Sequence, residues 1–149
     1  MCGIIGALGN NLNFDFDDAV KKLSHRGPDD IGFYKNEDNN IQLGHTRLAI
    51  IDLSKSTSQP MIDTINQNII IFNGEIYNFE FLKKKFLSDA EFYSNSDTEV
   101  LLKLYNLLGV DMLKYLDGIF AFAIFDKKTK EVFLVRDHLG VKPLHYFIK

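Results

Sequence analysis

Apolar residues recur at every third or fourth position in three segments of the chain, which is the spacing of an amphipathic helix. One segment follows Asp15, which is placed to cap a helix, and a second begins near Asn78. The third segment, SDTEVLLKLYNLLG, opens with Ser96 and Glu99 at the spacing of a capping box and ends on Gly109. The pattern therefore predicts three helices, and the one that follows Ser96 has the clearest boundaries.

Six other apolar runs have the length and composition of β-strands. They are GIIGALG, IGFYK, LGHTRLAII, NIIIF, GIFAFAIFD and EVFLVRD. The last two are joined by the polar turn KKTK and are expected to form a hairpin. In the run IFAFAIF both alternating sets of side chains are apolar, so we expect this strand to be covered on both faces.

Helices and strands together predict an α+β protein. Because doubly apolar strands need cover on both sides, we expect a four-layer αββα sandwich of two mainly antiparallel sheets flanked by helices. The polar stretch SKSTSQPMIDTINQ is predicted to be a connecting loop, and 149 residues is the length of a single domain.

Charge and cysteine content narrow the class of protein. With 17 basic and 20 acidic residues the net charge is −3, and no basic cluster is long enough to follow a nucleic acid backbone. The single cysteine cannot form an intramolecular disulfide, and no signal peptide or membrane-spanning run is visible. We therefore expect a cytoplasmic protein that binds neither nucleic acid nor membrane. None of the four histidines has a partner at metal-ligand spacing, so no metal is expected.

The only cysteine, Cys2, directly follows the initiator methionine. It fits two interpretations. It can be a small apolar residue that begins a strand, since free cysteine is often buried. Alternatively, removal of Met1 would leave Cys2 at the N-terminus with a thiol and a free amine on one residue, which is a nucleophile beside its own base.

Polar residues next to the strand-like runs are further candidates. Asn73 and Gly74 in FNGEIYN are expected where a strand ends, as oxyanion donors or as a tight turn. Arg47 in GHTRLAIID suits a substrate carboxylate, an internal salt bridge or an exposed edge position. Asp97 lies in the first turn of a capped helix, where an acid needs no function, and Glu75 can face solvent or pair with an ammonium group.

Taken in order, several motifs resemble one family. They are MCGIIG, HRGPDDIG, GHTRLAIIDL, QPM, FNGEIYN, SDTEVLL, GIFAFAIFD and RDHLGVKPL. The series is similar to the glutaminase domain of glutamine-hydrolysing asparagine synthetase, a class II glutamine amidotransferase of the N-terminal nucleophile fold. The resemblance runs from residue 2 to about residue 146. It implies that residues 1–149 are a glutamine amidotransferase type 2 domain, truncated at its C-terminus and lacking the ATP-dependent synthetase domain.

The resemblance also implies catalytic roles. Cys2, once Met1 is removed, would attack the side-chain amide of glutamine while its α-amine relays the proton. Asn73 and the N–H of Gly74 would hold the oxyanion. The expected reaction yields a glutamyl thioester and ammonia, and then glutamate.

The same resemblance implies a set of substrate contacts. Arg47 would bind the glutamine carboxylate, and Glu75 and Asp97 would lie near the α-ammonium group. The backbone near Ile50 and Ile51 is expected to line this pocket, together with Asn73 and Gly74.

The implied partners are L-glutamine and a synthetase domain, in cis or in trans. No cofactor is expected for glutamine hydrolysis, whereas ATP and Mg²⁺ would belong to the synthetase domain. Alternatives remain: a glutamine-binding or docking fragment without turnover, an ammonia donor to another acceptor such as a sugar, or a self-processing peptidase. A homodimer through exposed strand edges is a further possibility.

Overall fold

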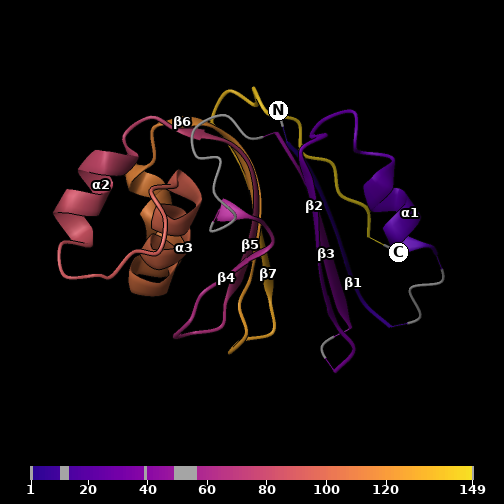
Figure 1. Ribbon diagram of the computed structural model, residues 1–149. Helices are drawn as coiled ribbons and strands as arrows, with labels where there is room; N and C mark the ends of the chain where they lie inside the picture. Colours follow the sequence, from indigo (N-terminus) through magenta and orange to yellow (C-terminus); the bar gives the residue numbers. More distant parts are fainter. Residues whose placement is uncertain (1, 11–13, 39, 49–56, 149) are drawn as a thin grey trace.

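Two antiparallel β-sheets face each other in the computed structural model, with helices on their outer sides (Figure 1). The structure describes residues 2–10, 14–38, 40–48 and 57–148. The N-terminal sheet has the order β1-β3-β2, formed by Gly3–Leu8, Ile41–Arg47 and Asp30–Asn36. The C-terminal sheet has the order β4-β5-β6-β7, formed by Met61–Ile62, Ile69–Ile76, Gly118–Phe125 and Val132–Arg136.

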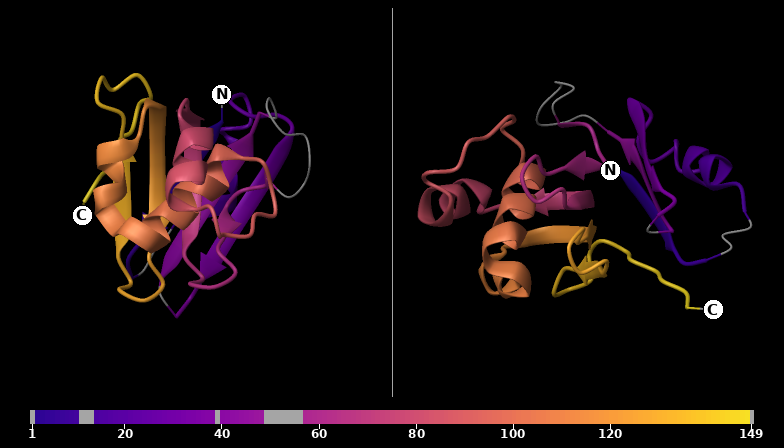
Figure 2. Two further views of the ribbon diagram at one scale, coloured as in Figure 1. Left: turned by 90° about the vertical axis from the view of Figure 1, so that its left-hand side faces the viewer. Right: turned by 90° about the horizontal axis from the view of Figure 1, so that it is seen from below.

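Helices cover the outer side of each sheet (Figures 1 and 2). Helix α1 (Phe16–Lys21) lies on the N-terminal sheet, and α2 (Phe79–Phe86) and α3 (Asp97–Leu108) lie on the C-terminal sheet. The α+β class, the two antiparallel sheets and the three helices are as the sequence predicts. A 3₁₀ helix, η2 (Gly109–Tyr115), follows α3 directly and is not predicted by the pattern.

Strand β6 is buried on both faces, which confirms the prediction from its doubly apolar sequence. Phe120, Phe122 and Ile124 pack in a cluster shared with α2 and α3. Ala123 and Phe125 point the other way and pack against β3 of the N-terminal sheet. The molecule therefore has one core between its two sheets and another between the C-terminal sheet and its helices.

The predicted helix caps are present. The carboxylate of Asp15 accepts a hydrogen bond from a backbone N–H in the first turn of α1, and Ser96 does the same for Glu99 in α3. The Glu99 side chain does not complete a capping box with Ser96. It instead accepts hydrogen bonds from the backbone N–H groups of Tyr93 and Ser94, so it fixes the approach to α3.

Strand β5 continues through the Asn73-Gly74 dipeptide and pairs with β6 along its whole length. The prediction that the strand ends at Phe72 is wrong, and so is the alternative of a tight turn. The turn preference is overridden by pairing with β6. Glycine is required here for close packing, because a Cβ atom on Gly74 would lie 2.3 Å from the carbonyl oxygen of Ile119.

The polar stretch predicted as a loop contains the short strand β4, which pairs with Ile69 and Ile70 of β5. The turn after it is held by Asp63, whose carboxylate accepts hydrogen bonds from the N–H groups of Ile65 and Asn66. A strand of two residues is too short to produce a periodic pattern, so sequence analysis cannot find it. Residues 54–56 of this stretch lie outside the described residues.

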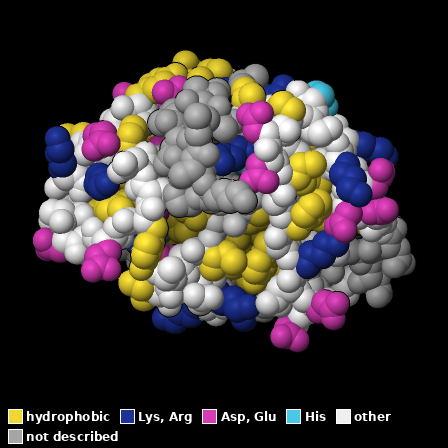
Figure 3. Space-filling model, viewed as in Figure 1, with side chains coloured by type: hydrophobic (Ala, Val, Ile, Leu, Met, Phe, Trp, Pro, Cys, Tyr) yellow, Lys and Arg dark blue, Asp and Glu magenta, His cyan; other side chains and the backbone are white. Residues whose placement is uncertain are grey.

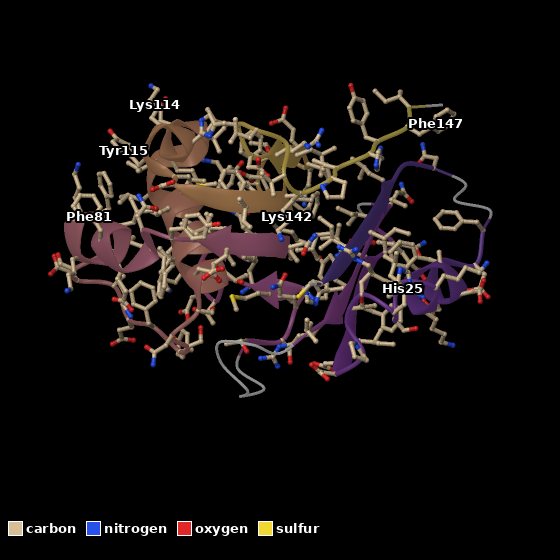
Figure 4. The ribbon with its side chains drawn as sticks, turned by 90° about the horizontal axis from the view of Figure 1, so that it is seen from above. His25, Phe81, Lys114, Tyr115, Lys142 and Phe147 are labelled. Atoms are coloured by element: carbon tan, nitrogen blue, oxygen red, sulfur yellow. The ribbon has the colours of Figure 1, made fainter. Side chains whose placement is uncertain are left out.

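Beyond β7 the chain makes a tight turn and then leaves the sheets as an extended segment. Burial alone would raise the pKa of Asp137, but hydrogen bonds from four backbone N–H groups outweigh it and lower the pKa. The turn brings Lys142 near the middle of the molecule, whereas Phe147 lies far from it (Figure 4). Tyr146, Phe147 and Ile148 are 75%, 85% and 83% exposed. The homodimer through exposed strand edges, which was raised from the sequence, stays a prediction.

Candidate active site

The predicted site residues Arg47 and Asn73 lie on the facing sides of the two sheets. Side chains alternate along a strand, and the odd-numbered residues of β3 and β5 form the core between the sheets. Arg47 and Asn73 belong to these odd-numbered sets. A contact of 3.3 Å between His45 Nε2 and the carbonyl oxygen of Phe72 brings the two strands together at this level.

Cys2 lies at the same end of the N-terminal sheet. It directly precedes β1, whose first residue, Gly3, pairs with Thr46 of β3. The backbone N–H of Leu48 lies 3.5 Å from the Cys2 Sγ atom and donates to it. The side chain is half-buried and belongs to neither apolar core, so its thiol lies at the edge of the sheet rather than inside it.

Arg47 is a buried cation in the central strand of its sheet. It is 9% exposed, so the alternative of an exposed edge position is wrong. Its guanidinium donates a hydrogen bond to the hydroxyl of Thr57. A largely buried guanidinium beside the space between the sheets is suited to binding a carboxylate, because burial strengthens such charge-assisted hydrogen bonds.

The backbone of β5 presents the N–H of Gly74 to a strand edge. Backbone groups of an antiparallel strand alternate between its two edges. The N–H of Phe72 bonds to the Gln59 side chain, and that of Ile76 bonds to Asp97, so the even-numbered residues point away from β6. The N–H of Gly74 therefore points to the edge beyond the end of β4, next to the buried Asn73 side chain.

Two carboxylates lie near the end of β5. Asp97, the first residue of α3, is 7% exposed and accepts a hydrogen bond of 3.0 Å from the N–H of Ile76. Burial raises the pKa of Asp97, and the negative charge of Glu75 raises it further, against the hydrogen bond from Ile76. A cationic group bound here would favour the charged form of both carboxylates and so oppose this shift, which makes the pair suited to an ammonium group.

Two of the predicted pocket residues, Ile50 and Ile51, lie outside the described residues. Gln59 and His45 contact Phe72 next to the candidate site, and sequence analysis did not assign them a role. The signals available were the QPM motif and the position of His45 on the same strand face as Arg47.

A cavity of about 230 Å³ lies between β4 and α3 and contains none of the predicted site residues. Its lining residues are Met61, Ile62, Asp63, Thr64, Tyr93, Glu99, Leu102 and Lys103.

Within the described ranges, no group of three His, Cys, Asp or Glu side chains is arranged to hold a metal ion. None of the helices in the described part of the chain combines the length and apolar character that a membrane crossing requires. On the face shown in Figure 3, basic and acidic side chains are interspersed.

Burial lowers the pKa of His45 from its ordinary 6.5 to about 4, although the contact with the Phe72 carbonyl acts in the opposite direction. Arg47 lowers this pKa further and Asp30 raises it. The folded protein therefore keeps a neutral imidazole at a pH where the unfolded chain takes up a proton. The titration of His45 leaves the free energy of unfolding unchanged above pH 6.5 and lowers it as the pH falls from 6.5 towards 4.

We expect the free energy of unfolding to fall by about 3 kcal/mol over this range because of His45. Urea unfolding at several pH values, compared between the wild type and His45→Gln, measures this difference. The raised pKa of Asp97 acts with the opposite sign, but it is present in both proteins and cancels in the comparison. Identical pH dependence in the two proteins would contradict the buried, neutral state of His45.

Comparison with known families identifies the class of protein. Residues 1–149 match the family described as glutamine amidotransferase domain. The chain belongs to this family, and it is a class II glutamine amidotransferase domain related to glutamine-hydrolysing asparagine synthetases. The resemblance found from the sequence motifs is thereby confirmed.

Several curated relatives align over nearly the whole chain. The putative asparagine synthetase [glutamine-hydrolyzing] 2 of Methanocaldococcus jannaschii is 43% identical, over 99% of this chain and 32% of that protein. Asparagine synthetase B [glutamine-hydrolyzing] of Escherichia coli is 36% identical, over 97% and 26%. Amidase chry2 of Gibberella zeae is 35% identical, over 99% and 24%. The chain therefore spans 24% to 32% of the length of these relatives.

A solved structure shares the fold. It is the glutamine phosphoribosylpyrophosphate amidotransferase from Bacillus subtilis in complex with ADP and GMP. The TM-score is 0.56 at 23% sequence identity, over 70% of this chain and 24% of that one. The likeness supports the mixed α+β architecture with two antiparallel sheets.

Proposed function

We propose that this chain is a glutaminase domain that hydrolyses glutamine through Cys2 and supplies ammonia to a partner domain. The observation that carries the proposal is the position of the thiol. Cys2 is the second residue of a chain that belongs to the glutamine amidotransferase family, and its half-buried Sγ lies at the sheet end near Arg47. An αββα fold of the N-terminal nucleophile type is part of this proposal.

The first chemical step requires Met1 to be removed. The free α-amine of Cys2 then takes the thiol proton, and the thiolate attacks the side-chain carbonyl carbon of glutamine. The carbonyl oxygen becomes an oxyanion, and the Asn73 amide and Gly74 N–H are the proposed donors to it. Support for these donors comes from the direction of the Gly74 N–H, which points to the edge of β5 beyond the end of β4.

Collapse of the tetrahedral intermediate breaks the carbon–nitrogen bond. The α-ammonium group of Cys2 returns its proton to the leaving nitrogen, so ammonia departs and a glutamyl thioester remains. Water then attacks the thioester, with the amine as base, and releases glutamate and the thiol. No metal or organic cofactor takes part in these steps as proposed.

Substrate recognition is proposed to use both ends of the amino acid. Arg47 would pair with the α-carboxylate, and Glu75 and Asp97 with the α-ammonium group. The pKa of Asp97, raised by burial and by Glu75, supports a cation-binding role for this pair. Backbone near Ile50 and Ile51 would complete the pocket.

The ammonia acceptor is proposed from the relatives. Those named as glutamine-hydrolysing asparagine synthetases favour aspartate, activated with ATP and Mg²⁺ by a synthetase domain in cis or in trans. A different acceptor, such as a sugar, is the second candidate.

The proposed location is the cytoplasm. These 149 residues contain no cysteine other than Cys2, which fits a reducing compartment.

Intact mass spectrometry tests the nucleophile and the pocket together. The protein is weighed before and after incubation with a diazoketone analogue of glutamine, which loses N₂ as a carbon–sulfur bond forms. We expect loss of Met1 and one adduct on Cys2, blocked by excess glutamine and absent from Cys2→Ala. Retained Met1, or no adduct on the folded protein, would contradict the proposal and favour a binding module without turnover.

A further inference from the structure

The outer edge of β5 is held by side chains where β4 ends. Strand β4 pairs with Ile69 and Ile70 and reaches no further along β5. At Phe72 the backbone N–H donates to Gln59 Oε1 at 2.6 Å, and the carbonyl oxygen lies 3.3 Å from His45 Nε2. Both polar groups of this residue are therefore bonded without a neighbouring strand.

Gln59 connects three parts of the fold. Besides its bond to Phe72, its Nε2 atom donates to the hydroxyl of Thr98 in the first turn of α3, at 3.3 Å. Its backbone lies directly on β2, because a Cβ atom on Gly32 would be 1.8 Å from the Gln59 carbonyl oxygen. Gln59 is 8% exposed, so the position of its side chain is set by packing on all sides.

His45 reaches the same peptide from the other sheet. It is 1% exposed and lies on β3, two residues before Arg47. The neutral imidazole has one ring N–H, and placing it on Nε2 makes the contact with the Phe72 oxygen a hydrogen bond. Among the described residues His45 is the donor recorded for this carbonyl, and pairing of a buried carbonyl favours this tautomer.

The two contacts act on the residues that follow them. Asn73 is the residue that follows Phe72 in the chain. Gly74 lies midway between Phe72 and Ile76, and the backbone N–H of Ile76 donates a hydrogen bond to Asp97. A strand fixed at Phe72 and Ile76 leaves little freedom for the peptide between them. Movement at Phe72 would turn the Asn73 side chain and the Gly74 N–H together.

We propose that Gln59 and His45 are positioning residues of the glutamine site, which hold Phe72 from the edge of β5 and so aim the oxyanion donors Asn73 and Gly74. This inference rests on the proposed glutaminase function. Both side chains are buried and bonded to the backbone of Phe72, so the role assigned to them is positioning and not contact with the substrate. Their effect is on the turnover step, because the oxyanion forms only after attack by the nucleophile.

Steady-state release of glutamate by the full chain tests the proposal. Gln59→Met and His45→Leu are expected to lower kcat by about 10- to 100-fold, with KM changed by less than about threefold. His45→Gln places an amide N–H near the position of Nε2 and is expected to restore most of kcat. This recovery separates the hydrogen bond from simple packing.

Asn68→Ala is the matched control. Asn68 lies just before β5, is 5% exposed, and bonds with its side chain to Asn106 and to the N–H of Lys127. Its loss removes two partly buried hydrogen bonds beside the opposite end of the same strand. We expect a similar loss of stability in urea unfolding but no change in kcat.

Hydrogen exchange supplies a measurement that does not depend on activity. In Gln59→Met the amide of Phe72 is expected to exchange about tenfold faster or more, while amides of β7 are unchanged. Faster exchange with kcat equal to that of Asn68→Ala would overturn the positioning role. An inactive wild type that also forms no Cys2 adduct would refute the glutaminase function itself, and this inference with it.

Discussion

Replacing Cys2 with alanine is expected to abolish the release of glutamate from glutamine. In the proposed reaction the thiolate forms the covalent bond to the substrate, and an alanine methyl group cannot do so. Removal of a nucleophile commonly costs on the order of 10⁴-fold or more in kcat, which places the variant at the background of a coupled glutamate assay. Alanine is small enough for Met1 removal, so the variant keeps the free amine.

Cys2→Ser is the comparison for this prediction. It keeps the size and the N-terminal amine and replaces only the sulfur, so residual activity above Cys2→Ala would report on the hydroxyl as a weaker nucleophile. Because Cys2 is half-buried and outside both apolar cores, neither variant should change the urea midpoint appreciably. Turnover by Cys2→Ala at the wild-type rate would refute the mechanism.

Replacing Asn73 with alanine is expected to lower kcat by about 100- to 1000-fold while KM changes by less than about threefold. The side-chain amide is proposed to donate to the oxyanion, which is absent from the bound substrate. Its loss therefore raises the energy of the transition state alone. Steady-state kinetics over a range of glutamine concentrations separate the two parameters.

Two further variants sharpen the Asn73 result. Asn73→Asp has nearly the same shape but replaces the donor with an acceptor, so its kcat is expected to be as low as that of the alanine variant. Arg47→Gln is expected to raise KM instead, since the proposed ion pair with the substrate carboxylate exists before reaction. Full activity of Asn73→Asp would show that the oxyanion has another donor.

Local sequence signals located most of the framework. The capping positions Asp15 and Ser96 identified where helices begin, because a capping side chain acts within three residues of its own position. The doubly apolar pattern of β6 indicated burial on both faces, because alternation along a strand records which side is covered. The ordered motifs pointed to the family.

The arrangement around the candidate site depends on contacts between distant segments. The Asn73-Gly74 dipeptide favours a turn locally, but pairing with β6 keeps it in the strand, where there is no room for a Cβ atom on Gly74. Likewise, no periodicity indicates that Gln59 and His45 meet at Phe72, since each comes from a different segment.

The sequence by itself thus determined the three α-helices, the six longer strands, the burial of β6 on both faces and the family, together with the candidate residues Cys2 and Arg47. Only the tertiary structure decided that β5 runs past Phe72, that Arg47 is central and buried, and that side chains replace a strand at the edge of β5. The physical reason is range. Periodicity and capping act over a few residues, whereas strand pairing and buried hydrogen bonds join residues that folding alone brings together.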